Sequence, residues 1–201
     1  MNKKIKIKIK EAIYKGFLQL YKYDLEIPSF DEKKDPIASK KREILQTFDS
    51  ILVLIYAPEM DSFVLCREFR PGVFFNPSQD DPYLLECVSG TIDAKKNAEE
   101  TAKNEVYEET GLTVDTVKLI ACAYKSPGIM TEKTYLYYTE VKGFPKSGLH
   151  GVGDEEIMTQ IIPRKRVYEL MDEMKIVDGA TLIALNWFRA NEGFPAKVNQ
   201  F

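Results

Sequence analysis

The segment of this chain that decides its fold spans residues 90–112 and reads GTIDAKKNAEETAKNEVYEETGL. Asn97 is a residue type that caps helix N-termini, and Glu100 follows three positions later, where its side chain completes a capping box. Gly111 suits the left-handed conformation in which many helices end. The segment therefore predicts a helix over residues 97–110, with a loop on either side.

Three glutamates crowd the C-terminal turns of this predicted helix. Glu105 lies about one turn from both Glu108 and Glu109, so pairs of like charge share one surface. The helix dipole is also unfavourable to carboxylates at this end, by about 0.3 to 1 kcal/mol each. Two interpretations stay open from the helix alone: a solvated acidic face, or a divalent cation such as Mg²⁺ or Mn²⁺ that compensates the charge.

The whole segment resembles the Nudix box, the motif of the Nudix hydrolase family. That motif is a glycine, five residues, a glutamate, seven residues, and then Arg-Glu-apolar-x-Glu-Glu-x-Gly-apolar. The chain matches it at Gly90, Glu105, Val106, Glu108, Glu109, Gly111 and Leu112. The resemblance implies a loop, helix and loop that bind catalytic metal through Glu105, Glu108 and Glu109.

Two positions depart from the motif. Lys96 stands where the family has its first glutamate, and Asn104 stands where it has arginine. An arginine there orients neighbouring carboxylates by charged hydrogen bonds, and its loss together with the glutamate removes a potential ion pair as a unit. We therefore expect that the metal ligands are retained while the support around them is weakened.

Three further segments resemble the branch of the family that hydrolyses ADP-ribose and other nucleoside diphosphate sugars. Residues 67–72 resemble its Arg-Gln-Phe-Arg-Pro stretch, residues 85–90 its Glu-x-x-Ala-Gly stretch, and residues 126–132 its Ser-Pro-Gly-x-x-Thr/Ser-Glu stretch. The resemblance implies substrate-binding roles for Arg67, Arg70, Glu86, Gly90 and Glu132. The aromatic side chains of residues 73–75 are candidates to stack on the base.

A further acidic group is expected after the glycine-containing residues 148–153. In this branch, a loop between late strands supplies an acid that binds metal or activates water, and Asp154, Glu155 and Glu156 stand there. Glu155 aligns best, so we assign catalytic roles to Glu155 and Glu108. A solvated acidic turn is the other interpretation.

The function implied by the resemblance is metal-dependent hydrolysis of the diphosphate linkage of a nucleoside diphosphate sugar. The cofactor is Mg²⁺, with Mn²⁺ as a second candidate, and the products are a nucleoside monophosphate and a sugar phosphate. ADP-ribose is the first expected substrate and UDP-glucose the second, because residues 69–74 and 135–139 also resemble UDP-sugar-cleaving members. The alternative is a module that binds nucleotide sugars without hydrolysing them, in keeping with the changed positions 96 and 104.

The pattern of the remaining chain predicts an α+β fold. Apolar strand-like runs at residues 51–56, 63–69, 117–124, 134–141 and 157–162 precede two late helical segments. This order favours a Nudix-type mixed sheet sandwiched between helices, an α/β/α sandwich, over a doubly wound parallel sheet. We place an N-terminal strand unit and loop at residues 1–41 and the Nudix hydrolase domain at residues 42–201.

The N-terminal residues alternate between lysine and isoleucine, which predicts a strand with one solvated face. Members of the branch commonly exchange such strands, so a homodimer is expected. The net charge of −3 gives no general attraction to nucleic acid. No pattern of a signal peptide or membrane helix occurs, so we expect a cytoplasmic protein that binds a small-molecule nucleotide sugar and neither nucleic acid nor membrane.

Cysteine and histidine leave little room for other chemistry. The three cysteines are far apart in apolar surroundings, which predicts buried thiols without disulfides. His150 is the single histidine, so neither an ordinary structural zinc site nor a histidine pair is available. Oxygen ligands must hold any metal.

Overall fold

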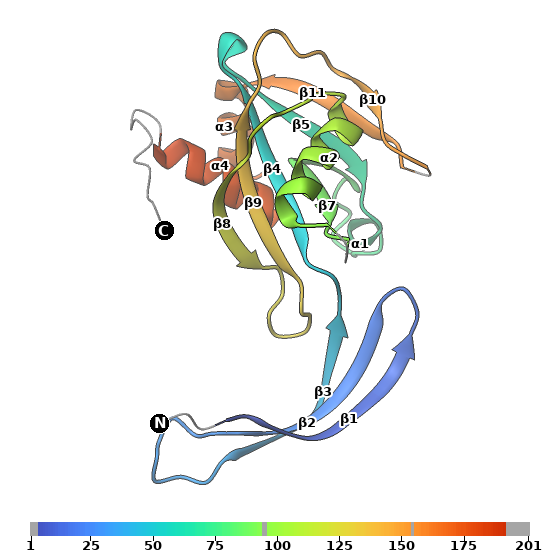
Figure 1. The fold of residues 1–201 in the computed structure, drawn as a ribbon, viewed down its shortest axis with the longest axis vertical. Coiled ribbons are helices and arrows are strands. Elements are labelled where there is room, and N and C mark those ends of the chain that lie inside the picture. Colours follow the sequence, from blue (N-terminus) through green and yellow to red (C-terminus); the bar gives the residue numbers. More distant parts are fainter. Residues whose placement is uncertain (1–3, 94–95, 154, 192–201) are drawn as a thin grey trace. The chain divides into compact units, whose positions relative to one another are not determined.

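The computed structural model describes residues 4–93, 96–153 and 155–191 and divides the chain into two compact units. The first unit contains residues 4–49 and 124–133, and the second contains residues 50–123 and those from 134 onward. Figure 1 shows their strands and helices. The predicted α+β class is confirmed, because strands and four α-helices both occur among the described residues.

The first unit holds a three-stranded antiparallel sheet made of β1 (Lys6–Lys15), β2 (Gln19–Ile27) and β3 (Ile37–Gln46), in that order. The lysine and isoleucine alternation lies in β1, where every residue is exposed. Ile7 and Ile9 are 61% and 52% exposed, so the described residues leave these side chains of β1 largely uncovered. The boundary placed between residues 41 and 42 falls inside β3 and stays a prediction.

The second unit is built on an eight-stranded sheet. Its strands are β4 (Ser50–Ala57), β5 (Ser62–Phe69), β6 (Tyr83–Glu86), β7 (Val88–Thr91), β8 (Lys118–Tyr124), β9 (Lys133–Glu140), β10 (Gly148–His150) and β11 (Ile157–Pro163). They follow the order β10-β11-β5-β4-β9-β8, with β6 paired to β5 and β7 to β4. The central strand β4 runs parallel to β9 and antiparallel to β5 and β7, so the sheet is mixed, as predicted.

Helices cover both faces of this sheet. They are α1 (Pro71–Phe74), α2 (Ala98–Thr110), α3 (Arg164–Asp172) and α4 (Gly179–Asn191). Along β4, Ile51 and Val53 belong to the buried cluster of α2, whereas Leu52 and Leu54 belong to the cluster of α3 and α4. Figure 1 shows α2 on one side of the sheet and α3 and α4 on the other. The sandwich is therefore confirmed, and β4 is continuously apolar because both of its faces are buried.

Two hydroxyl groups mark the start of the parallel pair of β4 and β9. Ser50 Oγ and Thr134 Oγ1 lie 2.8 Å apart, and both residues are buried. The same two residues face each other in the strand register. A polar contact thus fixes one end of an otherwise apolar strand pair.

The ends of α2 agree with the sequence analysis. The Glu100 N–H donates to Asn97 Oδ1 over 2.8 Å, and the Asn97 N–H donates to the Glu100 carboxylate, which completes the capping box. Gly111 has a φ of 68° and donates its N–H to the Tyr107 carbonyl over 2.8 Å. Both ends of the helix that carries the three glutamates are therefore fixed locally.

One expectation about the cysteines is wrong. Cys66 and Cys87 are buried, but Cys122 is exposed. Cys122 lies on β8, the last strand on its side of the sheet, where side chains alternate between the two faces. Ala121 and Ala123 pack against the buried cluster and Cys122 faces away.

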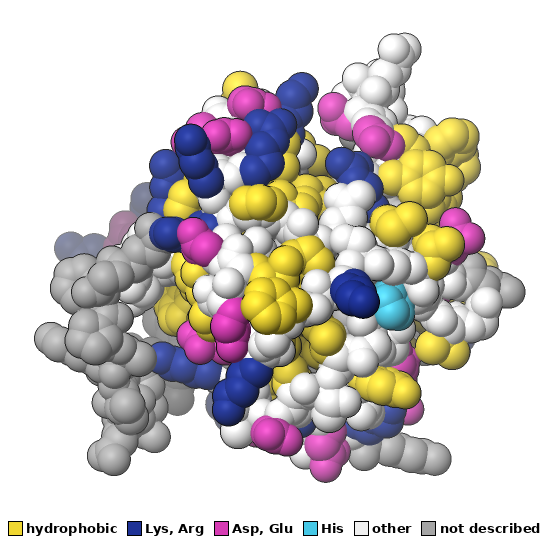
Figure 2. All heavy atoms as spheres, turned by 90° about the horizontal axis from the view of Figure 1, so that it is seen from above, with side chains coloured by type: hydrophobic (Ala, Val, Ile, Leu, Met, Phe, Trp, Pro, Cys, Tyr) yellow, Lys and Arg dark blue, Asp and Glu magenta, His cyan; other side chains and the backbone are white. Residues whose placement is uncertain are grey.

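The surface carries charges of both signs. On the face seen in Figure 2, basic, acidic and hydrophobic side chains are interspersed instead of being gathered by kind. Among the described residues, no helix is long and apolar enough to span a membrane. The cytoplasmic location expected from the sequence stays a prediction.

Candidate active site

Helix α2 presents its three glutamates in different surroundings. Its inner face is anchored by Ala102 and Val106, which are fully buried. Next to this face, Glu109 is buried, Glu105 is half-buried and Glu108 is exposed. The three carboxylates therefore form a gradient from the protein interior to solvent.

Glu109 is only 5% exposed, and residues of three strands form hydrogen bonds with it. The Ser89 N–H of β7 donates to Glu109 Oε1 over 3.2 Å, and the Cys66 thiol of β5 hydrogen-bonds to the same side chain. The Thr159 hydroxyl of β11 donates to the backbone carbonyl of Glu109 over 2.6 Å. Burial raises the pKa of Glu109 to about 8, against the Ser89 hydrogen bond and together with the charge of Glu105.

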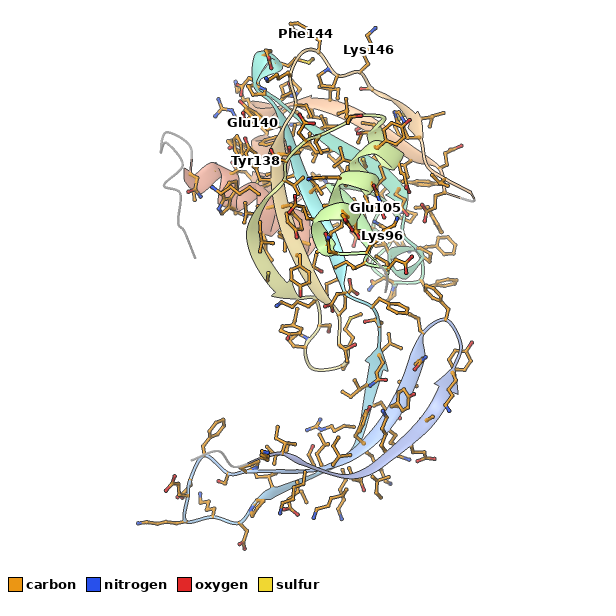
Figure 3. All side chains as sticks on the ribbon, viewed as in Figure 1. Lys96, Glu105, Tyr138, Glu140, Phe144 and Lys146 are labelled. Carbon is orange, nitrogen blue, oxygen red and sulfur yellow. The ribbon has the colours of Figure 1, made fainter. Side chains whose placement is uncertain are left out.

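Glu105 packs directly against the backbone of Gly90. A Cβ atom at Gly90 would lie 2.3 Å from both Cδ and Oε1 of Glu105, so only glycine fits without displacing that carboxylate. Burial, followed by the charges of Glu108 and Glu155, raises the pKa of Glu105 to about 7, and Lys96 opposes the shift. Figure 3 shows Lys96 next to Glu105.

Arg70 lies between two carboxylates just after β5. Its Nε donates to Glu86 Oε1 over 2.7 Å, and its Nη1 donates to Glu68 Oε1 over 3.0 Å. Its Nη2 lies 3.0 Å from Glu68 Oε2 and donates to Ser89 Oγ over 3.1 Å. Each nitrogen of the guanidinium thus has a protein acceptor.

Glu68 is a site residue that the sequence analysis missed. Burial raises its pKa, Arg70 lowers it and Glu155 raises it, and its own charge raises the pKa of both Glu105 and Glu109. Its signal in the sequence was a glutamate where the family stretch Arg-Gln-Phe-Arg-Pro has glutamine. We refer to Glu68, Glu105, Glu108, Glu109 and Glu155 as the carboxylate cluster.

Comparison with known proteins identifies the family of this chain. A sequence model described as the NUDIX domain matches residues 46–192. The chain belongs to the Nudix family. It is accordingly a Nudix hydrolase, and enzymes of this family generally use divalent metal ions.

Two curated relatives of this Nudix domain are pyrophosphatases. The ADP-ribose pyrophosphatase of Escherichia coli strain K12 is 30% identical over 187 residues, which cover 92% of this chain and 88% of the relative. The GDP-mannose pyrophosphatase of Salmonella typhimurium strain LT2 is 32% identical over 152 residues, which cover 75% and 78%. A crystal structure of an ADP compounds hydrolase shares the fold, with a TM-score of 0.71, 19% identity and coverage of 95% and 96%.

The predicted site residues outside the Nudix box have different surroundings in the structure. Glu155 is exposed, and its charge raises the pKa of Glu68 and Glu105, whereas Asp154 lies outside the described residues. Arg67 donates to the Tyr83 carbonyl over 2.8 Å. Glu132 belongs to the first unit and pairs with Lys125 at 2.9 Å. The roles assigned to all of these residues stay predictions.

The carboxylate cluster fits a divalent cation in its chemistry. Hard oxygen donors and uncompensated negative charge are what Mg²⁺ and Mn²⁺ require. Within the described part of the chain, no three His, Cys, Asp or Glu side chains are gathered in a geometry that holds an ion. Glu109 is buried, whereas Glu108 and Glu155 are exposed. The oxygen donor set therefore suits a divalent cation in its chemistry.

The raised pKa values predict that the metal-free protein loses stability as the pH rises. In the folded protein Glu105 and Glu109 hold protons up to about 7 and 8, whereas the ordinary pKa is 4.5. Unfolding therefore releases protons, and stability falls from about pH 4.5 to about pH 8. Melting temperatures in chelator should decrease between about pH 6 and pH 8.5, and Mg²⁺ should restore stability mainly at the higher pH. A melting temperature that rises with pH in chelator would contradict the raised pKa values of Glu105 and Glu109.

Gly90→Ala should weaken metal binding more than it weakens the fold. The added methyl group displaces the Glu105 carboxylate, which is the end of a flexible side chain, so a local shift relieves the overlap. We expect Mn²⁺ affinity, measured from the electron paramagnetic resonance signal of the free ion, to fall by about 10-fold. Gly179→Ala is the matched control, because a Cβ there meets no atom within 4 Å. Equal affinities of the two variants would refute the role of Gly90.

Proposed function

We propose that this Nudix hydrolase cleaves the diphosphate linkage of nucleoside diphosphate sugars and that the reaction depends on Mg²⁺ or Mn²⁺. The carboxylate cluster around buried Glu109 carries the proposal, because it gathers hard oxygen donors at the end of the box helix, where burial and neighbouring carboxylates raise the pKa values of Glu105 and Glu109. ADP-ribose is the preferred substrate, since the ADP-ribose pyrophosphatase relative is 30% identical over 92% of this chain, whereas the GDP-mannose pyrophosphatases are 28% identical over 92% or 32% identical over 75%. UDP-glucose remains the second choice from the sequence.

The proposed reaction is attack of water on one phosphorus of the P–O–P linkage. An oxygen–phosphorus bond forms, the bond to the bridging oxygen breaks, and Glu155 accepts the proton of the water. Glu105, Glu108 and Glu109 would hold the cation, and Glu108, as the most exposed of the three, lies nearest to an incoming substrate from solvent. A bound divalent cation neutralises the diphosphate and lowers the pKa of water.

Substrate recognition is proposed for β5, β6 and the residues around α1. Arg67 is partly exposed and uses one nitrogen on the Tyr83 carbonyl, which leaves donors for phosphate. Phe69 packs between Phe74 and Tyr83 with ring centroids at 5.9 and 5.6 Å, and these exposed rings offer a stacking surface for the base. Arg70 and Glu86 bind each other, so we assign them to holding the neighbouring side chains in place more than to direct contact with substrate.

A substrate panel tests the proposal. Purified protein is incubated with ADP-ribose, GDP-mannose or UDP-glucose in Mg²⁺, Mn²⁺ or chelator, and the nucleoside monophosphate is quantified. We expect AMP from ADP-ribose only with metal, and a loss on the order of 100-fold in Glu105→Gln and Glu109→Gln. Glu99→Gln is the control, because Glu99 is exposed on the same helix and pairs with Lys103.

The same panel addresses the alternative of a nucleotide-sugar-binding module without catalysis. A pure binder would release no monophosphate under any condition, yet its melting temperature would rise with ligand. That result would refute the proposed hydrolysis. Retained activity in Glu109→Gln would instead refute the assignment of the cluster.

A homodimer is proposed through the first unit. The exposed Ile7 and Ile9 form an apolar row on β1 that a second copy of the sheet is suited to cover. Light scattering coupled to size-exclusion chromatography should give twice the mass of one chain for the native protein. The double variant Ile7→Glu/Ile9→Glu should have the mass of one chain. Ile183→Glu, at an exposed isoleucine of α4, should remain dimeric. A native protein with the mass of one chain would end the proposal.

A further inference from the structure

The ion pair of Arg70 is more than a surface contact. Glu68 Oε1 accepts from Arg70 Nη1 over 3.0 Å, Glu68 Oε2 lies 3.0 Å from Arg70 Nη2, and Glu86 accepts from Arg70 Nε over 2.7 Å. The side chains of Glu68 and Glu86 are 18% and 7% exposed, so solvent screens these contacts weakly. The planar fork of the guanidinium is therefore fixed in position and orientation.

This fixed arginine reaches the buried metal ligand through a single residue. Arg70 Nη2 donates to the Ser89 hydroxyl over 3.1 Å, and the N–H of the same serine donates to Glu109 over 3.2 Å. Arg70 and Glu109 also interact directly through their charges. A run of hydrogen bonds thus leads from Glu68 through Arg70 and Ser89 to Glu109.

The Nudix box of this chain lacks two charged residues that the family motif has. Asn104 is exposed and neutral at the position of the motif's arginine, and Lys96 reverses the charge of the motif's glutamate. At residue 68 the change is the opposite one, from the glutamine of the related stretch to glutamate. This chain therefore lacks a glutamate–arginine pair at positions 96 and 104 and has one at positions 68 and 70.

We propose that the ion-pair support of the metal-binding carboxylates has moved in this chain from the Nudix box to the end of strand β5, where Glu68 and Arg70 are positioning residues for Ser89 and Glu109. The inference rests on the proposed function in taking Glu109 as a metal ligand. A glutamine at position 68 would offer Arg70 one acceptor oxygen and no charge. With Glu86 as the remaining charged partner of its ion pair, Arg70 would interact more strongly with Glu109, and a cation would have to compete with it.

The experiment measures Mn²⁺ affinity of the full chain by electron paramagnetic resonance, alongside the Mg²⁺ dependence of nucleotide-sugar hydrolysis. Glu68→Gln should bind Mn²⁺ about 10-fold more weakly and need correspondingly more Mg²⁺, with little change in KM for the nucleotide sugar. Glu68→Asp keeps the charge and should stay within about threefold of the native affinity. Glu59→Gln, at an exposed glutamate before β5, is the control and should have no effect.

A rescue distinguishes moved support from general damage to the fold. Lys96→Glu/Asn104→Arg restores the motif, and adding it to Glu68→Gln should bring Mn²⁺ affinity back to within about threefold of the native value. Native affinity in Glu68→Gln would overturn the proposal, and so would a loss that the restored box does not repair.

The outcome is separable from the proposed function. If the native protein releases no monophosphate from any nucleotide sugar, while Glu68→Gln loses Mn²⁺ affinity and the restored box recovers it, the hydrolytic proposal fails and the positioning role of Glu68 and Arg70 stands. If hydrolysis occurs and the Glu68 variants bind Mn²⁺ as the native protein does, the hydrolytic proposal stands and the positioning role of Glu68 and Arg70 fails.

Discussion

The burial of one carboxylate at the end of a helix is the constraint on which the site depends. Glu109 is only 5% exposed and lies where the dipole of α2 is unfavourable to negative charge. Burial raises the pKa of Glu109 to about 8, and hydrogen bonds from the Ser89 N–H and the Cys66 thiol to its carboxylate oppose that shift. The strands around α2 therefore supply polar partners for this carboxylate as well as side chains of the apolar core.

The box helix could be predicted because its signals are local. The capping box of Asn97 and Glu100, the glycine at residue 111 and the spacing of the glutamates are all contained in one short segment. The apolar runs also predicted the central strands, since continuous burial of β4 produces an uninterrupted apolar sequence.

The contacts around Arg70 could not be predicted in the same way. They join β5, β6 and β7, whose neighbours are set by pairing with different strands and not by sequence spacing. Glu68 was overlooked for this reason, although its departure from the family stretch was visible. Likewise, the exposure of Cys122 follows from the place of β8 in the sheet, which no local pattern reveals.

The apolar character of β4 affects how its register with the neighbouring strands is fixed. A strand buried on one face loses burial when it slips by one residue, but β4 would only exchange one apolar layer for the other. The hydroxyls of Ser50 and Thr134 are polar partners that such a slip would separate within the core. The contact between these two hydroxyls therefore fixes the register of β4 against β9, and β4 in turn pairs with β7, the strand whose Ser89 N–H donates to the buried Glu109.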